Sequence, residues 1–290
     1  MPKVQVVTDS TAYFEPGVAE RLGIHIVPLR VHFGDETFRE GIDITPERFF
    51  RKLAESSVPP RTSPPPVEEF RAVYRELNKT TDEIISIHVS SKLSRTCEVA
   101  TAAANALLGR CEIAVIDSLT VSLGLGILAK AAAEAANRGE SLDSIVRLIR
   151  GMIPHIYVVF FVEALDYLER GGRIGQAQAL LGTMLNIKPF LTVEDGEIIP
   201  MEKVQDRDKA IDKLFEFMAE FAHIEQMAII QSTPEPTQET DLLIERLEMV
   251  FPDLKFPILV YGPTLASHIG PDTLGVIVYE GMNETGQSPK

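Results

Sequence analysis

The first half of the chain alternates short apolar runs with stretches of helical periodicity. The apolar runs predict strands at 4–7, 25–33, 83–89 and 112–116. The periodic stretches predict helices at 18–22, 46–53, 67–77, 96–108 and 119–136. Strands joined by helical crossovers pair in parallel, so we expect a three-layer α/β domain with a mainly parallel sheet. Gly34-Asp35 adds one predicted hairpin turn.

The second half predicts an α/β domain with a mixed sheet. A helix at 142–152 is followed by Pro154 and a continuous apolar run at 156–162, so we place the domains at 1–154 and 155–290. Asp195-Gly196 predicts a hairpin between strands 189–193 and 197–201. Helices are predicted at 207–221 and 239–250, and strands at 227–231, 257–261 and 274–279. The boundary is approximate, and exchange of elements between the domains stays open.

Charge and cysteine content exclude some classes of function. The 290 residues carry a formal net charge of −14, with no Lys/Arg-rich run to offset it. Such a field repels phosphate backbones, so we expect no nucleic-acid partner. Cys97 and Cys111 form no CxxC motif and have no cluster of histidines beside them, so neither a zinc site nor a disulfide framework is indicated. We therefore expect no metal and no cofactor.

The sequence also predicts where the protein resides. The opening MPKVQVVTDS enters an apolar strand directly and lacks the regions of a signal peptide. The most lipid-like stretch, 119–136, is too short and too polar to span a bilayer. We expect a cytoplasmic protein.

Ser and Thr residues gather just after several predicted strands. The clusters are Thr8-Asp9-Ser10-Thr11, then Ser90-Ser91 with Ser94 and Thr96, and then Asp117-Ser118. The carboxyl ends of parallel strands share one edge, where helix N-termini favour an anion. The alternative is that these residues are ordinary helix caps or turn residues, which is the expectation for Asp9.

Two further segments offer donors to an anion. In the proline-rich segment 59–66, the remaining backbone donors belong to Arg61, Thr62 and Ser63, at the entrance to a helix. A helix-capping linker is the alternative reading. His268 lies in a predicted Gly/Pro-bounded loop between two strands, where Asp272 could raise its pKa or orient its ring.

A Gly-rich segment follows in the second half of the chain. Residues 168–175 match neither a Walker A motif nor a GxGxxG fingerprint, and their double glycine indicates a helix C-terminus. Arg170, Arg173 and Lys188 make this stretch locally basic, and it is a candidate docking surface.

Taken together, these motifs resemble the DegV family along essentially the whole chain. The motifs are Thr8 to Thr11, Thr62-Ser63, Ser90-Ser91 with Ser94 and Thr96, Val115 to Ser118, Leu168 to Ile174, Ile187-Lys188-Pro189, and Gly262-Pro263 with His268 and Gly270-Pro271. Each motif is weak alone, but their order and spacing together indicate a common fold and ligand class.

The resemblance implies two α/β domains with a long-chain fatty acid between them. It places the fatty acid carboxylate on Thr62, Ser63, Ser94 and His268. Arg95, Ser91 and Ser118 are further candidates from the sequence itself. The resemblance also implies that the protein is not itself an enzyme. Instead it presents the fatty acid to a separate ATP-binding fatty acid kinase subunit, in phospholipid metabolism, and that subunit docks near Arg170 and Arg173. Transient membrane contact is expected, because free fatty acid resides in the bilayer.

The chain departs from the family pattern at three positions. Arg95 and Cys97 stand where the family usually has Gly and an aromatic residue, and Asp272 stands where Gly is common. Arg95 would either pair with the carboxylate or phosphate or point into solvent. These departures leave the choice of headgroup and chain open.

Two other functions are weighed against the carrier. A serine hydrolase acting on a lipid-like ester would use Ser94 with His268 and either Asp9 or Asp272. Against it, Ser94 does not lie in a G-x-S-x-G elbow. The other alternative is a binding module for another small carboxylate or for a regulatory lipid.

Overall fold

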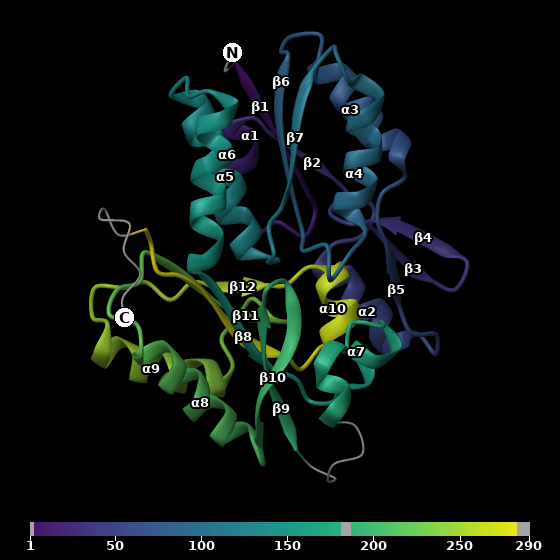
Figure 1. The fold of residues 1–290 in the computed structure, drawn as a ribbon. Helices are drawn as coiled ribbons and strands as arrows, with labels where there is room; N and C mark the ends of the chain where they lie inside the picture. The colour runs from purple at the N-terminus through teal and green to yellow at the C-terminus, as the bar shows by residue number, and fades with distance from the viewer. Residues whose placement is uncertain (1–2, 181–186, 283–290) are drawn as a thin grey trace. The chain divides into compact units, whose positions relative to one another are not determined.

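The computed structural model describes residues 3–180 and 187–282, and they form two compact units (Figure 1). The first unit comprises Met1–Pro154, Asp195–Glu197 and Gly262–Thr264. The second comprises His155–Glu194, Ile198–Tyr261 and Leu265–Lys290. The predicted fold class is confirmed, with a parallel sheet in the first unit and a mixed sheet in the second.

A four-stranded parallel sheet with the order β2-β1-β6-β7 is the centre of the first unit. Its strands are β1 (Val4–Asp9), β2 (Ile24–Val27), β6 (Glu83–His88) and β7 (Glu112–Asp117). One face carries α1 (Val18–Leu22), α5 (Leu123–Asn137) and α6 (Leu142–Met152), and the other carries α3 (Val67–Leu77) and α4 (Thr96–Ala104) (Figure 1). The α3 and α4 face is sealed by Phe70, Tyr74 and Ala100 against Val7 and Ile84. All five of these side chains are removed from water, which is the main stabilising contribution.

The first unit also contains a small antiparallel sheet with the order β4-β3-β5. Its strands are β3 (Arg30–Phe33), β4 (Glu36–Arg39) and β5 (Arg61–Ser63), and α2 (Pro46–Glu55) follows β4 in the chain. The hairpin at Gly34-Asp35 is confirmed, because Phe33 pairs with Glu36. The single predicted strand 25–33 is wrong: it divides into β2 and β3 at Pro28, which has no N–H to donate to a ladder.

The second unit is built on a six-stranded mixed sheet with the order β10-β9-β8-β13-β11-β12. Its strands are β8 (Ile156–Phe161), β9 (Lys188–Glu194), β10 (Glu197–Val204), β11 (Gln226–Gln231), β12 (Ile258–Val260) and β13 (Leu274–Tyr279). Helices α8 (Arg207–Ala219) and α9 (Gln238–Val250) supply Leu214, Leu243 and Leu247 to a core completed by Val159 and Val276. The hairpin at Asp195-Gly196 is confirmed, with φ of 48° and 80° at the two turn residues.

Several shorter elements differ from the predictions. Helix α5 begins at Leu123 rather than 119, because Leu119 and Ser122 have φ of 51° and 58° and cannot continue a right-handed helix. The predicted helix 96–108 becomes α4 followed by a 3₁₀ turn, η1 (Asn105–Leu107). Further short elements are η2 (Ile153–His155), α7 (Asp166–Arg170), η3 (Gly175–Leu180) and α10 (Pro263–Ile269). Across residues 3–180 and 187–282, no helix has both the length and the apolarity to cross a membrane.

Candidate functional site

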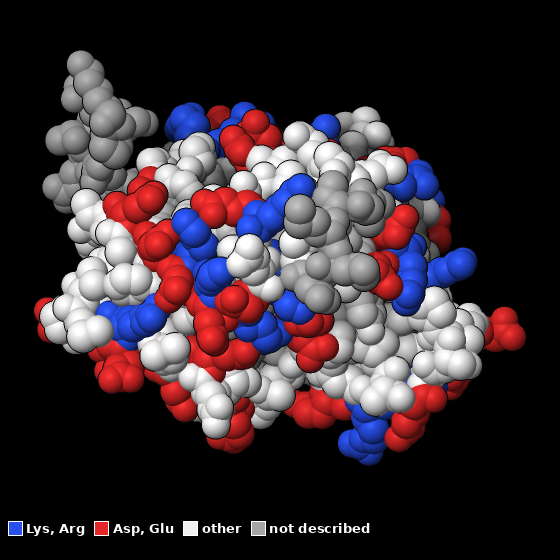
Figure 2. All heavy atoms as spheres, turned by 90° about the horizontal axis from the view of Figure 1, so that it is seen from below, with Lys and Arg blue, Asp and Glu red and all other residues white. Residues whose placement is uncertain are grey.

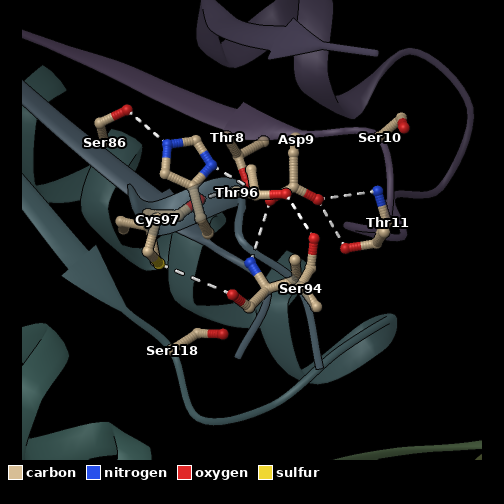
Figure 3. Close-up of polar contacts among 12 residues, drawn as sticks. Thr8, Asp9, Ser10, Thr11, Ser86, Ser94, Thr96, Cys97 and Ser118 are labelled. Carbon is tan, nitrogen blue, oxygen red and sulfur yellow. Dashed lines mark hydrogen bonds and ion pairs between the residues drawn. The ribbon is translucent and has the colours of Figure 1, made fainter. Parts of the chain in front are cut away.

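The hydroxyl-rich segments meet at the carboxyl edge of the parallel sheet. Strands β1, β6 and β7 are direct neighbours and run in the same direction, so the turns after them share this edge. Figure 3 shows the side chains of Asp9, Ser94 and Thr96 close together there, with Ser118 to one side. The predicted grouping of these segments on one edge is therefore confirmed.

Asp9 organises the turns after β1 and β6. Its Oδ1 accepts hydrogen bonds from the Thr11 backbone N–H at 3.0 Å and from Thr11 Oγ1 at 2.6 Å. Its Oδ2 accepts from the Val89 backbone N–H at 3.0 Å and lies 3.1 Å from His88 Nδ1. Asp9 is fully buried, so these donors replace the water it loses. The expectation that Asp9 is a turn residue is confirmed.

A buried polar chain continues from Asp9 through β6. His88 Nε2 lies 2.7 Å from Ser86 Oγ, and Ser86 Oγ lies 2.8 Å from the Tyr74 hydroxyl. Ser86, His88 and Asp9 have the residue types of a catalytic triad, but none of the three is exposed to solvent. A hydrolytic triad has to reach its substrate, so we assign this chain a structural role.

The turn after β6 places Ser94 just before α4. The Ser94 backbone N–H donates to the Ser90 carbonyl at 2.9 Å, and Ser94 Oγ lies 2.8 Å from Thr96 Oγ1. Ser90 Oγ donates to the Gly196 carbonyl at 2.7 Å. These bonds hold the partly buried Ser94 hydroxyl in a fixed place at the sheet edge.

The other candidates on this edge already have protein partners. Arg95 is 74% exposed at its side chain and forms two 2.7 Å hydrogen bonds to Glu98, so it takes the solvent-facing alternative. The Ser91 backbone N–H donates to Asp117 Oδ1 at 3.1 Å. Ser118 is fully buried, and its Oγ donates to the Thr120 carbonyl at 3.2 Å. Burial also raises the pKa of the Cys97 thiol well above its usual range.

Glu40 is a site residue that the sequence did not reveal. Its Oε1 accepts from the Thr264 backbone N–H at 2.8 Å, and its Oε2 accepts from Ser10 Oγ at 2.6 Å and Thr264 Oγ1 at 2.7 Å. A Cβ at Gly262 would lie 2.6 Å from Oε1, which explains the glycine there. Burial raises the pKa of Glu40. This carboxyl group ties the turn after β1 to the start of α10.

Thr62 and Ser63 lie in β5 at the edge of the small sheet. The proline-rich segment is therefore partly a strand, which the sequence pattern did not predict. Adjacent residues of a strand point to opposite faces, so the two hydroxyls diverge. Thr62 pairs with Val31, and Ser63 pairs with Arg30 and has its Oγ 2.9 Å from His32 Nε2.

His268 lies in the second unit, on α10. The predicted loop is wrong, because Pro263 starts a helix whose fixed φ suits the first turn. Burial, with a smaller contribution from the charge of Arg173, lowers the pKa of His268 to about 3. The expectation that Asp272 raises this pKa is wrong. A Cβ at Gly171 would lie 2.2 Å from His268 Nδ1, so the double glycine makes room for the imidazole ring.

The Gly-rich segment also ends α7, as predicted. Gly172 has φ of 66°, and the Arg173 N–H donates to the Leu168 carbonyl at 2.9 Å, which completes a Schellman motif. Arg170 is exposed and pairs with Asp166, and Lys188 pairs with Glu163. Burial lowers the pKa of the Arg173 guanidinium. Arg170 is thus the more accessible of the two predicted docking residues.

Metal chemistry has no ligand set in the part of the chain that the structure describes. No group of three or more His, Cys, Asp or Glu side chains there is placed to hold an ion. What the edge offers instead is hydroxyl groups and backbone N–H groups, the neutral donors that suit an anionic oxygen ligand.

Comparison with known proteins gives one consistent result. A family model described as uncharacterised protein, DegV family, matches residues 3–281. Protein DegV of Bacillus subtilis (strain 168) is 35% identical over 277 residues, covering 94% of this chain and 98% of that protein. The crystal structure of DegV from Bacillus subtilis, described as a fatty acid binding protein, covers 96% of this chain and 100% of its own at 34% identity, with a TM-score of 0.86. A DegV family protein from Thermus thermophilus, described by its fatty acid binding, covers 97% and 100% at 34% identity, with a TM-score of 0.84.

Fold and site together define an α/β protein whose parallel sheet presents hydroxyl-bearing turns at its carboxyl edge. The match extends over nearly the whole chain, in sequence and in structure alike. The chain belongs to the DegV family.

Proposed function

We propose that this protein binds one long-chain fatty acid and holds its carboxylate with neutral donors. The observation that carries the proposal is the 34% identity, over 96–97% of the chain, to two solved structures of proteins described as fatty acid binding. Each buried methylene contributes roughly 0.8 kcal/mol, so an acyl chain can supply most of the binding energy. The polar site then has only to orient the carboxylate.

The proposed carboxylate ligands are Thr62, Ser63 and Ser94 from the first unit and His268 from the second. Because β5 is an edge strand, a carboxylate beside it can be approached by Thr62 from one face and by Ser63 from the other. Ser94 is supported by its fixed, partly buried hydroxyl beside Thr96. His268 is neutral above about pH 3, so it acts as a hydrogen-bond donor rather than as a cation. Ser91, Ser118 and Arg95 stay predictions, and their existing partners at Asp117, Thr120 and Glu98 argue for supporting roles.

Removal of these donors tests the carboxylate assignment. A Thr62→Ala, His268→Ala double variant is expected to lose at least tenfold in affinity for oleate, since hydrogen bonds to a charged group contribute about 1.5–3 kcal/mol each. Titration of the delipidated protein measures this change. Thr101→Ala, at an exposed position of α4, is the control and is expected to bind oleate as the parent does. Full lipid occupancy in the double variant would show that the carboxylate is held elsewhere.

The protein is further proposed to present this fatty acid to a separate ATP-binding kinase subunit. The carboxylate would attack the γ-phosphorus of ATP to give an acyl phosphate and ADP, with the chain itself supplying no chemistry. A cytoplasmic carrier of this kind takes up its ligand through transient contact with a membrane. Hydroxylamine traps acyl phosphates as hydroxamates, so hydroxamate is expected only when protein, fatty acid, kinase subunit and ATP are all present. Hydroxamate formed without the kinase subunit would overturn this division of labour.

The kinase subunit is proposed to dock near Arg170 and Arg173. Figure 2 shows basic and acidic side chains interspersed on the face that it draws. Arg170→Ala is expected to slow hydroxamate formation without changing oleate affinity, because its side chain is exposed. The control is Arg138→Ala, which removes an exposed arginine of the first unit paired with Glu140. Equal rates for the two variants would remove Arg170 from the docking surface.

The serine hydrolase is not proposed, because its required groups are already engaged. The carboxylate of Asp9 is already hydrogen-bonded to Thr11, His88 and Val89 within the first unit. Ser94 Oγ has a hydroxyl neighbour in Thr96 instead of a general base. Labelling of Ser94 by a fluorophosphonate would reinstate that function.

A further inference from the structure

One face of the small β4-β3-β5 sheet combines positive charge with the Ser63 hydroxyl. Side chains of directly paired residues share a face, and the register pairs Arg30 with Ser63 and His32 with Arg61. On β4 the partners of Arg30 and His32 are Arg39 and Thr37. The opposite face carries the apolar side chains Val31, Phe33 and Phe38 and the Thr62 hydroxyl. Three arginines therefore share this face with Ser63; Asp43 pairs with Arg39, and Glu69 contacts Arg30.

Arg30 is the member of this group of arginines whose hydrogen bonding is incomplete. Its side chain is only 13% exposed, and its Nη2 contacts Glu69 of α3. Its Nη1 is buried and has no hydrogen-bond partner within residues 3–180 and 187–282. A buried donor of a charged group costs free energy unless an acceptor meets it. This atom therefore indicates an acceptor that the described residues do not provide.

His32 determines which way the Ser63 hydroxyl can donate. Its Nε2 lies 2.9 Å from Ser63 Oγ and its Nδ1 lies 2.9 Å from Thr37 Oγ1. A neutral imidazole donates from one nitrogen and accepts at the other. When Nε2 carries the proton, Ser63 accepts from His32 and its own O–H is left to donate to a ligand. Thr37 then donates to Nδ1, and the chain of donors runs in one direction toward the ligand.

We propose that Arg30 is the charged partner of the fatty acid carboxylate and that His32 positions Ser63 to donate to the same group. The inference rests on the proposed function and adds two residues to its carboxylate site. Register places the Cβ atoms of Arg30 and Ser63 within about 5.5 Å, a separation that one carboxylate can bridge. Glu69 contacts Nη2 of Arg30 and leaves the buried Nη1 donor for a second acceptor. Arg95, the arginine that the sequence suggested, is exposed and forms two hydrogen bonds to Glu98.

The test compares arginine variants of the delipidated full-length protein against two probes, oleate and oleyl alcohol. Arg30→Gln is expected to weaken oleate binding roughly ten- to hundredfold, since it removes a hydrogen bond from a charged donor to a charged acceptor. Its affinity for oleyl alcohol, which has no charge, should stay within about twofold of the parent. Arg138→Gln, the matched control from an exposed pair, should bind both probes as the parent does.

A second pair of variants separates binding from folding and tests His32. Arg30→Gln leaves Glu69 without its cation, so the Arg30→Gln, Glu69→Gln double variant restores neutrality and should show the same selective loss of oleate. His32→Leu is expected to weaken oleate binding about two- to tenfold in the parent, and to have no further effect in a Ser63→Ala background.

The outcomes distinguish this inference from the proposed function. Failure of the parent itself to bind oleate would remove the proposed function. If the parent binds oleate but both Arg30 variants keep its affinity, the charge assignment is overturned. Equal loss of oleate and oleyl alcohol in the Arg30 variants would overturn it too. An effect of His32→Leu that persists in Ser63→Ala would remove His32 as the positioning residue.

Discussion

Buried polar groups at the sheet edge are satisfied by partners far away in the sequence. Asp9 binds the turn after β6 through Val89, and Glu40 binds Ser10 and Thr264. Each hydrogen bond replaces hydration that the group loses on folding. Removal of one partner therefore leaves the other buried without a hydrogen bond. The geometry of the candidate site therefore depends on a few buried carboxyl groups.

The carboxyl group of Glu40 is expected to contribute strongly to stability. Glu40→Ala leaves Ser10 Oγ and two donors of Thr264 without their acceptor, and it should lower the free energy of unfolding by about 3 kcal/mol. Glu40→Gln keeps one acceptor oxygen and should lower the free energy of unfolding by roughly half as much as Glu40→Ala does. Urea unfolding measures both changes. Glu98→Ala removes an exposed partner and serves as the control with no measurable change. Unaltered stability in Glu40→Ala would show that the cluster is not an anchor.

His268 gives the fold a dependence on pH. Its pKa is about 3 in the folded protein and near 6.5 in the unfolded chain, so between these values the unfolded state binds the proton and the folded state does not. The free energy of unfolding must therefore decrease as the pH falls below 6.5. His268 alone should lower it by about 2 kcal/mol at pH 5. Urea unfolding of the parent and of His268→Gln at pH 7 and pH 5 isolates the contribution. An equal acid sensitivity in both proteins would mean that His268 is protonated in the fold.

At the scale of elements, the sequence predicted long periodic helices well and short irregular segments poorly. Helices α3 and α6 have the predicted limits, because each carries a long apolar stripe. Strand β5 was missed inside a proline-rich run, since it exists only through pairing with β3. Helix α10 was missed because seven residues between Gly and Pro signals carry little periodicity. Pairing and packing, which no local window contains, decided these elements.

The contact between α5 and the turn after β1 leaves no room for a side chain at Gly126. A Cβ there would lie 1.8 Å from the Tyr13 carbonyl oxygen, a backbone atom with little freedom to move. Gly126→Ala should therefore lower the free energy of unfolding by about 3 kcal/mol. Gly109→Ala is the control: it has φ of +78° but open space, and should cost about 1 kcal/mol. Similar unfolding midpoints for the two variants would mean that α5 can shift away from Tyr13.

At the scale of the whole molecule, the parallel topology made part of the site predictable. It follows from the crossover rule that the segments after β1, β6 and β7 share an edge. The roles of Glu40, Arg30 and His32 were not predictable, because each depends on a partner that only the folded sheets place beside it. The chain carries a net charge of −14, and only the strand pairing of the folded protein brings arginine side chains together beside Ser63.

Native mass spectrometry of the freshly purified protein, followed by denaturing extraction of lipid, tests the central claim most directly. The account predicts a stoichiometric mass increment that is released as one long-chain fatty acid. A protein that is empty, and that also fails to take up added oleate, would contradict the claim that it is a fatty acid carrier.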